Sequence, residues 1–351
     1  MDTVDLRSDF IARPGEAMLE AFARAARGPL EFGLREDPHQ RQLEERMAAL
    51  LGCEDALVFP TCTMANTVAV LLASQPGDRL LVQPQAHMLL SEAGAAAALA
   101  GVVPEAVAPH GSGPVEAILP PADAWREALR APVDAQRSRV ALCALENTHN
   151  RGGGFPLPAA ATRAITDLAH EAGARAHLDG ARLFAAATAL GVPLSALAAG
   201  FDTTSVSLNK ALGAPVAAVL GASRTAIARA LPLRQRLGGG IRPVGPACAA
   251  TLAGLDDLSH LAQVQALARR LASGLQAAGL QVASPEHITS MVLVRVPAPL
   301  DAHALVSRCA DRGVLALAMD ARLVRFALYR GVTAAGVDRA IDAATAAVRA
   351  G

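Results

Sequence analysis

Short apolar runs with the composition of β-strands alternate with helical stretches along residues 55–222, and this alternation restricts the possible folds more than any other feature of the chain. Helical stretches such as residues 159–172 separate most of these runs. Strands that alternate with helices predict a mostly parallel α/β sheet with helices on both faces. Ligands of such sheets bind at the carboxyl ends of the strands. The expected strands are residues 56–59, 79–82, 140–145, 175–179, 203–208 and 216–220.

The pattern changes after Gly240 to a mixture of long helical stretches and short strands. Such a mixture predicts a smaller α+β domain. We therefore expect a large α/β domain at residues 1–245, which includes the N-terminal segment, and a small domain at residues 246–351. The expected elements of the small domain are helices at residues 246–278, 302–312 and 333–349 and strands at residues 290–296 and 323–328.

A lysine and an aspartate end two of the expected strands. Lys210 follows the run at 203–208 and precedes a Gly-Ala-Pro loop, and Asp179 ends the run at 175–179. Most lysines are solvated surface charges, but here nearly all the positive charge is arginine, which cannot form a Schiff base. A lysine can form a Schiff base with pyridoxal phosphate (PLP), and an aspartate can keep the pyridine nitrogen protonated. The pair therefore predicts a PLP site.

Residues 59–66 leave one expected strand and open a helix. Free N–H groups and the positive end of the helix dipole favour a phosphate at such a place. The hydroxyl groups of Thr61 and Thr63 would add hydrogen-bond donors. The alternative is an ordinary helix N-cap, for which threonine is a common choice.

Polar residues also follow two other expected strands. His87 comes after the run at 79–82, where an imidazole could stack on a pyridine ring or be a packed surface histidine. Residues 146–150, of sequence ENTHN, continue the apolar run at 140–145. Polar residues in that position are poor core material, so they favour a ligand site. A turn that uses the glycines at 152–154 is the alternative.

Composition limits the partners and the compartment. No apolar run reaches the roughly 18 residues that a membrane span needs, and the N-terminus lacks the apolar segment of a signal peptide. The formal net charge is +0 and no basic run is present, which argues against nucleic acid. The 5 cysteines are widely spaced and predict reduced thiols rather than disulfides or a zinc site. We expect a cytoplasmic protein with a small-molecule ligand and no metal.

Taken together, the motifs resemble the L-type threonine aldolases of the aromatic amino acid β-eliminating lyase/threonine aldolase family. These are PLP-dependent enzymes with the aspartate aminotransferase fold. The matching segments occur in the family's order across residues 5–242, and Val324-Arg325-Phe326 extends the match. The segments are DLRSD at 5–9, EDP at 36–38, TMAN at 63–66, QAH at 85–87, ENTHN at 146–150, HLDGARL at 177–183, Lys210 with GAP at 213–215, and LGGGIR at 237–242.

The resemblance implies a role for each residue at the cofactor. Lys210 would carry PLP as a Schiff base, Asp179 would pair with the pyridinium nitrogen, and His87 would stack on the ring. Cys62 and Thr63 would hold the phosphate through backbone N–H and hydroxyl groups.

The resemblance also implies contacts to the substrate and between subunits. Arg182 would lie near the phenolic oxygen of the cofactor and the substrate carboxylate, and Ser8 and Arg325 would bind that carboxylate. Arg242 would reach the phosphate from a neighbouring subunit, so we expect a homodimer or homotetramer with shared active sites. The planar fork of arginine suits a carboxylate or phosphate.

Several positions depart from the family pattern. Thr61-Cys62-Thr63 replaces Ser-Gly-Thr, so a side chain stands where the family has a glycine beside the phosphate. Phe32 and Ser91 replace two tyrosines, and Leu328-Tyr329 replaces Thr-His after the carboxylate arginine. A histidine that many members carry ahead of ENTHN is absent, and Asp134 is the nearest residue in the alignment. The residues expected at the cofactor are thus largely kept, and those expected at the substrate are altered.

The resemblance implies an aldolase that cleaves the Cα–Cβ bond of β-hydroxy-α-amino acids of the threonine and allo-threonine type to glycine and an aldehyde. His87, or a water that it orients, is the candidate base. One alternative keeps PLP but removes the Cα proton, as a β-eliminating lyase, dehydratase or racemase does. Another is a non-catalytic binding protein with the same fold, against which the presence of Lys210 and Asp179 argues.

Overall fold

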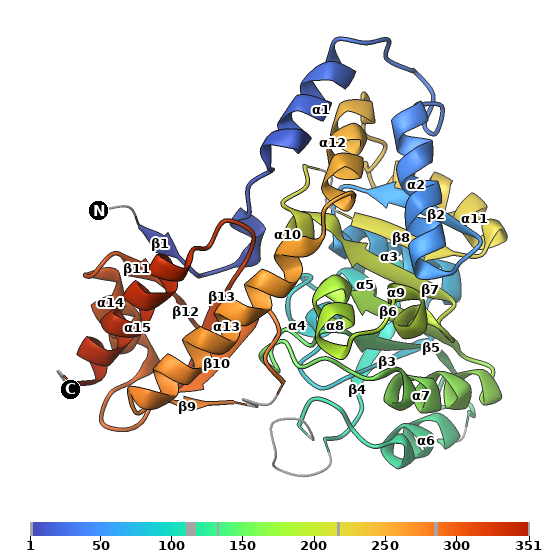
Figure 1. Ribbon diagram of the computed structural model, residues 1–351. Helices are drawn as coiled ribbons and strands as arrows, with labels where there is room; N and C mark the ends of the chain where they lie inside the picture. The colour runs from blue at the N-terminus through green and yellow to red at the C-terminus, as the bar shows by residue number, and fades with distance from the viewer. Residues whose placement is uncertain (1–2, 110–116, 132, 216–217, 284–286, 350–351) are drawn as a thin grey trace.

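A seven-stranded sheet forms the centre of the computed structural model, which describes residues 3–109, 117–131, 133–215, 218–283 and 287–349 (Figure 1). The strand order is β2-β8-β7-β6-β5-β3-β4. Only β8 runs antiparallel to its neighbours, so the predicted mostly parallel sheet is confirmed. The strands are β2 (Asp55–Phe59), β3 (Arg79–Val82), β4 (Val103–Ala106), β5 (Val140–Glu146), β6 (Arg175–Gly180), β7 (Thr203–Ser207) and β8 (Ala218–Ala222).

Two strands differ from the sequence expectation. β4 was not predicted, because it is an exposed edge strand with no apolar run, and Pro104 is tolerated at an edge, where no N–H is needed. The strand expected at 216–220 lies at Ala218–Ala222 instead, and its first two expected residues, 216 and 217, lie outside the described residues.

Helices cover both faces of the sheet because successive strand residues point to opposite faces. In β2, Ala56 and Val58 contribute to one apolar core, whereas Leu57 and Phe59 contribute to another. The helices around the sheet are α2 (Pro38–Leu51), α3 (Cys62–Ala73), α5 (Ala95–Ala100), α6 (Ala122–Arg130), α7 (Ala159–Glu171), α8 (Leu183–Leu190), α9 (Leu194–Ala198) and α11 (Arg224–Arg236).

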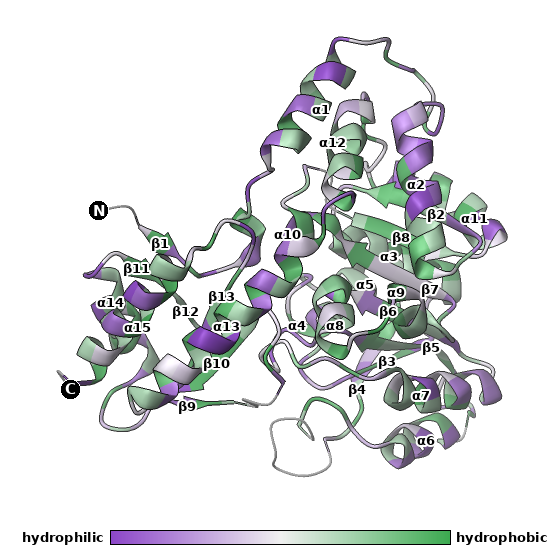
Figure 2. Ribbon diagram, in the orientation of Figure 1, coloured by the Kyte–Doolittle hydropathy of each residue, from purple (hydrophilic) through white to green (hydrophobic). Residues whose placement is uncertain are grey.

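The C-terminal part has its own antiparallel sheet, in the order β12-β13-β10-β9, with α13, α14 and α15 packed around it (Figure 1). The predicted helix at 246–278 is two helices, because the chain turns at residues 256–258. α13 alternates between hydrophilic and hydrophobic positions, as expected of a helix with one face on a core (Figure 2). The elements are α12 (Gly245–Leu255), α13 (Ser259–Ala277), β9 (Gln281–Val282), β10 (Met291–Arg295), α14 (Ala302–Ala310), β11 (Val314–Leu315), β12 (Leu317–Ala318), β13 (Leu323–Ala327) and α15 (Ala334–Arg349).

The N-terminal segment connects the two parts. β1 (Val4–Asp5) pairs with β11, and Leu6 belongs to the apolar core of the C-terminal part. A short 3-10 helix, η1 (Asp9–Ile11), and α1 (Glu16–Ala26) then lead back to the large sheet, where α1 packs on α12. Residues of α12 itself pack in the core of the large sheet. The division at residues 245 and 246 remains a prediction from the sequence.

Candidate active site

Lys210 and Asp179 lie close together because their strands are neighbours. β6 and β7 run parallel, with Asp179 opposite Ser205, and Asp179 lies near the carboxyl end of β6. α10 (Leu208–Leu212) begins where β7 ends and carries Lys210. Leu208 and Leu212 are fully buried and fix this short helix. The lysine and the aspartate that the sequence singled out therefore share one edge of the sheet.

Lys210 is a buried amine. Its residue is 7% exposed, and its Nζ atom lies 4.7 Å from the centroid of the Phe10 ring. Burial lowers the pKa of Lys210, and the charge of Arg182 lowers it further. A lysine with a lowered pKa is more often neutral, and only the neutral amine is a nucleophile.

Asp179 is held by two donors. Its Oδ2 atom accepts a hydrogen bond of 3.0 Å from the Nδ2 atom of Asn66, and its Oδ1 atom accepts one of 3.1 Å from the Ala181 N–H. The residue is 2% exposed. Asn66 belongs to the TMAN segment at 63–66, and the sequence alone does not predict a role for it. A buried asparagine in an otherwise apolar helix was the available signal, because such an amide requires partners.

His87 begins α4 (His87–Leu90) beside three carboxylates. Its backbone N–H donates to Oε2 of Glu146 at 2.7 Å, and its Nδ1 atom lies 2.9 Å from Oε1 of Glu92. Burial lowers the pKa of His87, but Glu92, Asp179 and Glu146 outweigh burial and raise it above its usual value. Glu92 was not a predicted site residue.

α3 begins at Cys62, directly after β2, as the sequence predicts for the helix start proposed to bind phosphate. Thr61 is the N-cap, and its Oγ1 atom accepts a hydrogen bond of 3.1 Å from the Met64 N–H, so the N-cap interpretation holds for this residue. Cys62 and Thr63 form the first turn, where N–H groups have no partner within the helix. Cys62 is partly exposed, but its thiol is desolvated, which raises its pKa to about 12. The thiol is therefore protonated and is not a nucleophile at neutral pH.

Arg182 forms a buried ion pair with Asp9. Its Nε and Nη2 atoms donate to the two oxygens of Asp9 at 2.7 and 2.8 Å, and both side chains are almost fully buried. Asp9 lies in the DLRSD segment but was not assigned a role. Because this pair uses only two of the five N–H groups, both N–H groups of Nη1 and one of Nη2 are left for another ligand.

Arg325 retains a free donor. Its Nη1 atom donates to Oδ1 of Asn150 at 2.6 Å and its Nη2 atom to the Arg7 carbonyl oxygen at 3.0 Å, while Nε is buried and unpaired among the described residues. Burial lowers the pKa of Arg325 to about 10, which leaves it charged at neutral pH. Ser8 lies next to Arg7 and accepts a hydrogen bond from the Phe10 N–H as the N-cap of η1.

The ENTHN segment serves the scaffold around the site. Glu146 accepts from the Asn150 N–H, Asn147 exchanges two hydrogen bonds with Leu157, and His149 accepts from the Gly152 N–H. The predicted alternative of a turn supported by glycines is therefore present. Asn150 contacts Arg325 and thereby links this turn to the predicted carboxylate site.

Arg242 and the altered positions Phe32 and Ser91 are exposed, whereas the altered position Tyr329 lines the same small cavity as Lys210. Arg242 is exposed, and its guanidinium carbon lies 5.3 Å from the ring centroid of Phe32, which is itself 83% exposed. Ser91 is exposed at the end of α4. The Tyr329 hydroxyl donates to the Asp5 carbonyl oxygen at 2.8 Å.

The residues present fit PLP. A buried lysine with a lowered pKa, a buried carboxylate and a helix start with free N–H groups are brought to one edge of the sheet. These are the amine, the partner of a pyridinium nitrogen and the phosphate site that the cofactor requires. His87, Glu92 and Asp179 offer atoms that could bind a metal ion, all within 4.8 Å of one another. Hydrogen bonds from Asn66 to both carboxylates and between His87 and Glu92 explain why these side chains lie close together.

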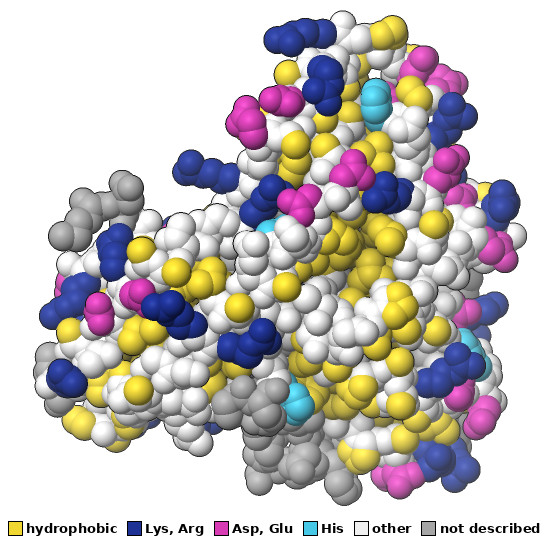
Figure 3. Space-filling model, viewed as in Figure 1, with side chains coloured by type: hydrophobic (Ala, Val, Ile, Leu, Met, Phe, Trp, Pro, Cys, Tyr) yellow, Lys and Arg dark blue, Asp and Glu magenta, His cyan; other side chains and the backbone are white. Residues whose placement is uncertain are grey.

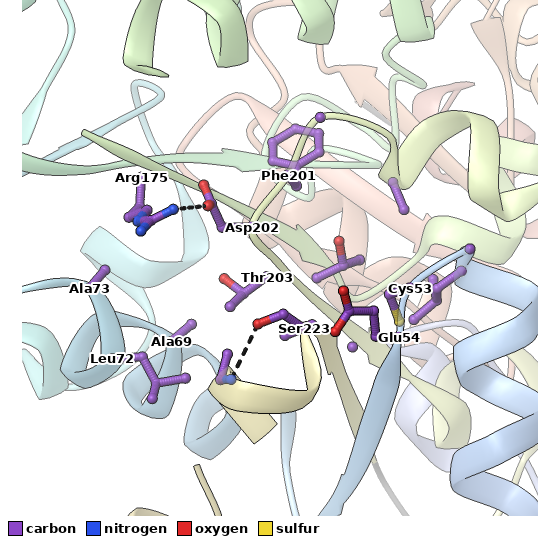
Figure 4. A pocket seen from close by; sticks show the side chains of 18 of the residues that line it. Cys53, Glu54, Ala69, Leu72, Ala73, Arg175, Phe201, Asp202, Thr203 and Ser223 are labelled. Carbon is purple, nitrogen blue, oxygen red and sulfur yellow. Dashed lines mark hydrogen bonds and ion pairs between the residues drawn. The ribbon is translucent and has the colours of Figure 1, made fainter. Parts of the chain in front are cut away.

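A separate cavity of about 830 Å³ lies at the opposite edge of the sheet (Figure 4). Its charged side chains have partners within the protein: Arg175 donates to Asp202 at 2.7 Å, Glu54 accepts from the Arg224 backbone N–H at 3.0 Å, and Arg229 donates to the Leu72 carbonyl oxygen at 3.2 Å. Ser223 caps α11. This cavity therefore lacks the catalytic groups that Lys210 has around it.

The sequence profile of the β-eliminating lyase family matches residues 5–298. Low-specificity L-threonine aldolase 1 of Arabidopsis thaliana is 34% identical over 343 residues, which covers 96% of this chain and 94% of the plant protein. The low specificity L-threonine aldolase of Escherichia coli K12 is 35% identical over 294 residues, 84% of each chain. The fold is similar to that of Leishmania major threonine aldolase, with a TM-score of 0.82 at 19% identity over 98% of this chain and 99% of that one. None of the described helices is both long and apolar enough to cross a membrane.

Proposed function

Because this chain belongs to the β-eliminating lyase family, in which its relatives are low-specificity L-threonine aldolases, we propose that it cleaves β-hydroxy-α-amino acids to glycine and an aldehyde. The protein is a PLP-dependent lyase. The observation that carries this proposal is the placement of Lys210, with its lowered pKa, and Asp179 at the same edge of the sheet.

PLP bound through Lys210 supplies an acceptor for the electron pair that is released when a bond at Cα breaks. Asp179 would hold the proton on the ring nitrogen, and the first turn of α3 at Cys62 and Thr63 would bind the phosphate. Asn66 and the Ala181 N–H keep the Asp179 carboxylate in place for this task.

Arg325 and Ser8 would hold the substrate carboxylate. Nη1 and Nη2 of Arg325 each donate one N–H, to Asn150 and Arg7, and each keeps a second N–H for a ligand. Arg182 is fixed by Asp9 and keeps three N–H groups, on Nη1 and Nη2, for other partners. With the carboxylate fixed, His87 or a water that it orients would take the β-hydroxyl proton as the Cα–Cβ bond breaks and the aldehyde leaves.

We further propose that the active protein is a homodimer or homotetramer with shared sites, in which Arg242 binds the phosphate of the partner subunit. Arg242 is exposed and has no ion pair in the described part of its own chain. Phe32 beside Arg242 and Phe10 beside Lys210 are 83% and 59% exposed, so a subunit contact that covers them would remove apolar surface from water. The free thiols support a cytoplasmic location.

The test is a product analysis of purified, PLP-loaded protein with L-threonine, L-allo-threonine and β-phenylserine. We expect equal amounts of glycine and of acetaldehyde or benzaldehyde. A 2-oxo acid with ammonia would indicate a dehydratase or β-eliminating lyase, and an inverted amino acid would indicate a racemase. Either result without glycine would overturn the proposed aldolase reaction. The departures at Phe32, Ser91 and Tyr329 make the preferred aldehyde side chain an outcome to be measured.

A further inference from the structure

The side chain of Glu92 is a buried carboxylate that the roles proposed above leave unused. It is 3% exposed, and its Oε1 atom lies 2.9 Å from Nδ1 of His87. The same oxygen accepts a hydrogen bond of 2.8 Å from Nδ2 of Asn66. Removing a carboxylate from water is costly unless it is paired and hydrogen-bonded, so its neighbours indicate what it does.

The Asn66 amide has contacts at both its oxygen and its nitrogen, and together they fix its orientation. Its Oδ1 atom accepts hydrogen bonds from the Ser205 hydroxyl at 2.7 Å and from Nε2 of His177 at 3.1 Å. Burial lowers the pKa of His177 to about 4, so this ring is neutral and carries one proton. Nδ1 of His177 lies 2.8 Å from the Thr203 hydroxyl and 3.2 Å from the Thr203 carbonyl oxygen. On its other side, Asn66 meets carboxylate oxygens of Glu92 and Asp179, which accept hydrogen bonds, so its Oδ1 atom faces His177 and the ring proton lies on Nε2. The Asn66 NH₂ group must therefore face Glu92 and Asp179.

This amide bridges two carboxylates. One N–H of Asn66 points to Glu92 and the other to Asp179 at 3.0 Å. Oε1 of Glu92 is thus an acceptor in both of its contacts, and Nδ1 of His87 must be the donor in the second one. In the neutral imidazole, a proton on Nδ1 leaves the lone pair on Nε2.

We propose that Glu92 is a positioning residue that holds His87 in the tautomer with the proton on Nδ1, so that Nε2 can accept a proton from the substrate. Asn66 connects this pair to the carboxylate that pairs with the pyridine nitrogen. The role of His87 as a base rests on the proposed function. The pairing of Glu92 with His87 follows from their distance alone.

The pairing sets a direction for the pH dependence. His87 faces Glu92 from the segment after α4, Glu146 from β5 and Asp179 from β6, and these negative charges stabilise the imidazolium. The imidazolium cannot accept a proton, so activity must rise as the pH rises through the pKa of His87. Removal of the Glu92 charge lowers that pKa. The rise in activity then moves to lower pH.

The test compares Glu92→Gln, Glu92→Leu and the wild-type protein. Gln keeps an acceptor without the charge, and Leu removes both. We expect kcat to fall by about ten- to a hundredfold, the range seen when a metal-bound histidine loses its carboxylate partner. In Glu92→Gln, the acid limb of the kcat profile should also move to lower pH. NMR of ¹³C,¹⁵N-histidine-labelled protein without PLP follows the titration of His87 directly, and a His87→Asn variant assigns its signals. The His87 imidazole should titrate at lower pH in Glu92→Gln than in the wild type. In Glu92→Leu it should lose its preference for a proton on Nδ1.

Glu44→Gln is the matched control, because Glu44 is a second buried glutamate and pairs with Arg35 at 2.8 Å away from His87. It should shift neither the His87 titration nor the acid limb. Unchanged titration and tautomer of His87 in both Glu92 variants would overturn the inference, even if stability or activity fell. If wild type forms no glycine and aldehyde, the proposed reaction fails, and the NMR result alone decides the role of Glu92.

Discussion

Lys210 is the only lysine in the sequence, although the chain has 32 lysines and arginines together. Its surroundings explain why arginine cannot replace it. The Nζ atom lies against the Phe10 ring in a buried site that lowers its pKa, whereas a guanidinium stays charged and forms no Schiff base. At the scale of single residues, the chemistry of the site therefore depends on one amine.

Lys210→Ala should abolish turnover, because no other lysine can form the bond to PLP. Borohydride reduction offers a direct measurement. Wild-type protein should gain one pyridoxyl group on Lys210, located by mass spectrometry of its peptides, and the variant should gain none on any side chain. Turnover close to that of wild type in the variant would refute the assignment of Lys210.

Asp179→Asn should retain PLP but slow catalysis by roughly a hundredfold or more, the scale of losing one preorganised electrostatic contact. Without the carboxylate, the pyridine nitrogen loses its proton and the ring accepts electrons poorly. PLP content by absorbance and kcat for glycine release are the two measurements. A kcat within a few-fold of wild type would show that Asp179 is not the nitrogen's partner.

At the scale of elements, the site depends on how closely β6 approaches β7. Gly180 follows Asp179, and a Cβ atom added to it would lie 2.6 Å from the Ser205 carbonyl oxygen, a backbone atom that cannot move aside alone. The contact between these two strands therefore determines where the Asp179 carboxylate lies relative to Lys210.

Gly180→Ala should push β6 away from β7, with a loss of about 1–3 kcal/mol in the free energy of unfolding, the usual cost of overpacking. Weaker PLP binding should accompany it. Denaturant unfolding and PLP titration measure the two effects. Gly221→Ala in β8 is the control, since its Cβ would meet only side-chain atoms of Leu51 and Cys53. Equal PLP affinity in both variants would contradict this account.

At the scale of the whole molecule, the site is assembled from both parts of the chain. Ser8 and Asp9 follow directly on β1 and Leu6, which pack in the C-terminal part, and Arg325 comes from β13. Arg182 and Asp179 come from the large sheet and the residues that follow it. Basic and acidic side chains are interspersed on the face shown in Figure 3.

Mixing Lys210→Ala protein with Arg242→Ala protein should partly restore activity if the site is shared. Mixed dimers would carry both changes in one site and keep the other site intact. About a quarter of the wild-type activity is expected after full exchange of subunits in a dimer, because half of the dimers are mixed. Activity with threonine and subunit exchange by mass labelling are measured together. No recovery despite complete exchange would place Arg242 outside the partner's site.

Sequence alone determined the α/β sheet and the positions of Lys210 and Asp179. Both depend on local patterns: short apolar runs define strands, and parallel strands bring their carboxyl ends to one edge. The motif order also identified the family that the comparisons show. The roles assigned to Cys62, Thr63, Ser8, Arg325 and Arg242 came from that resemblance, and they stay predictions.

Only the tertiary structure decided which polar groups meet. Asp9 reaches Arg182 across 173 positions, Arg325 reaches Arg7 across 318, and Asn66 joins Asp179 to Glu92. Apolar periodicity reports which face of an element is buried, but it does not specify the partner of a buried polar group. That partner is set by the packing of distant segments, because every buried polar group has to be satisfied by whichever group the fold places beside it.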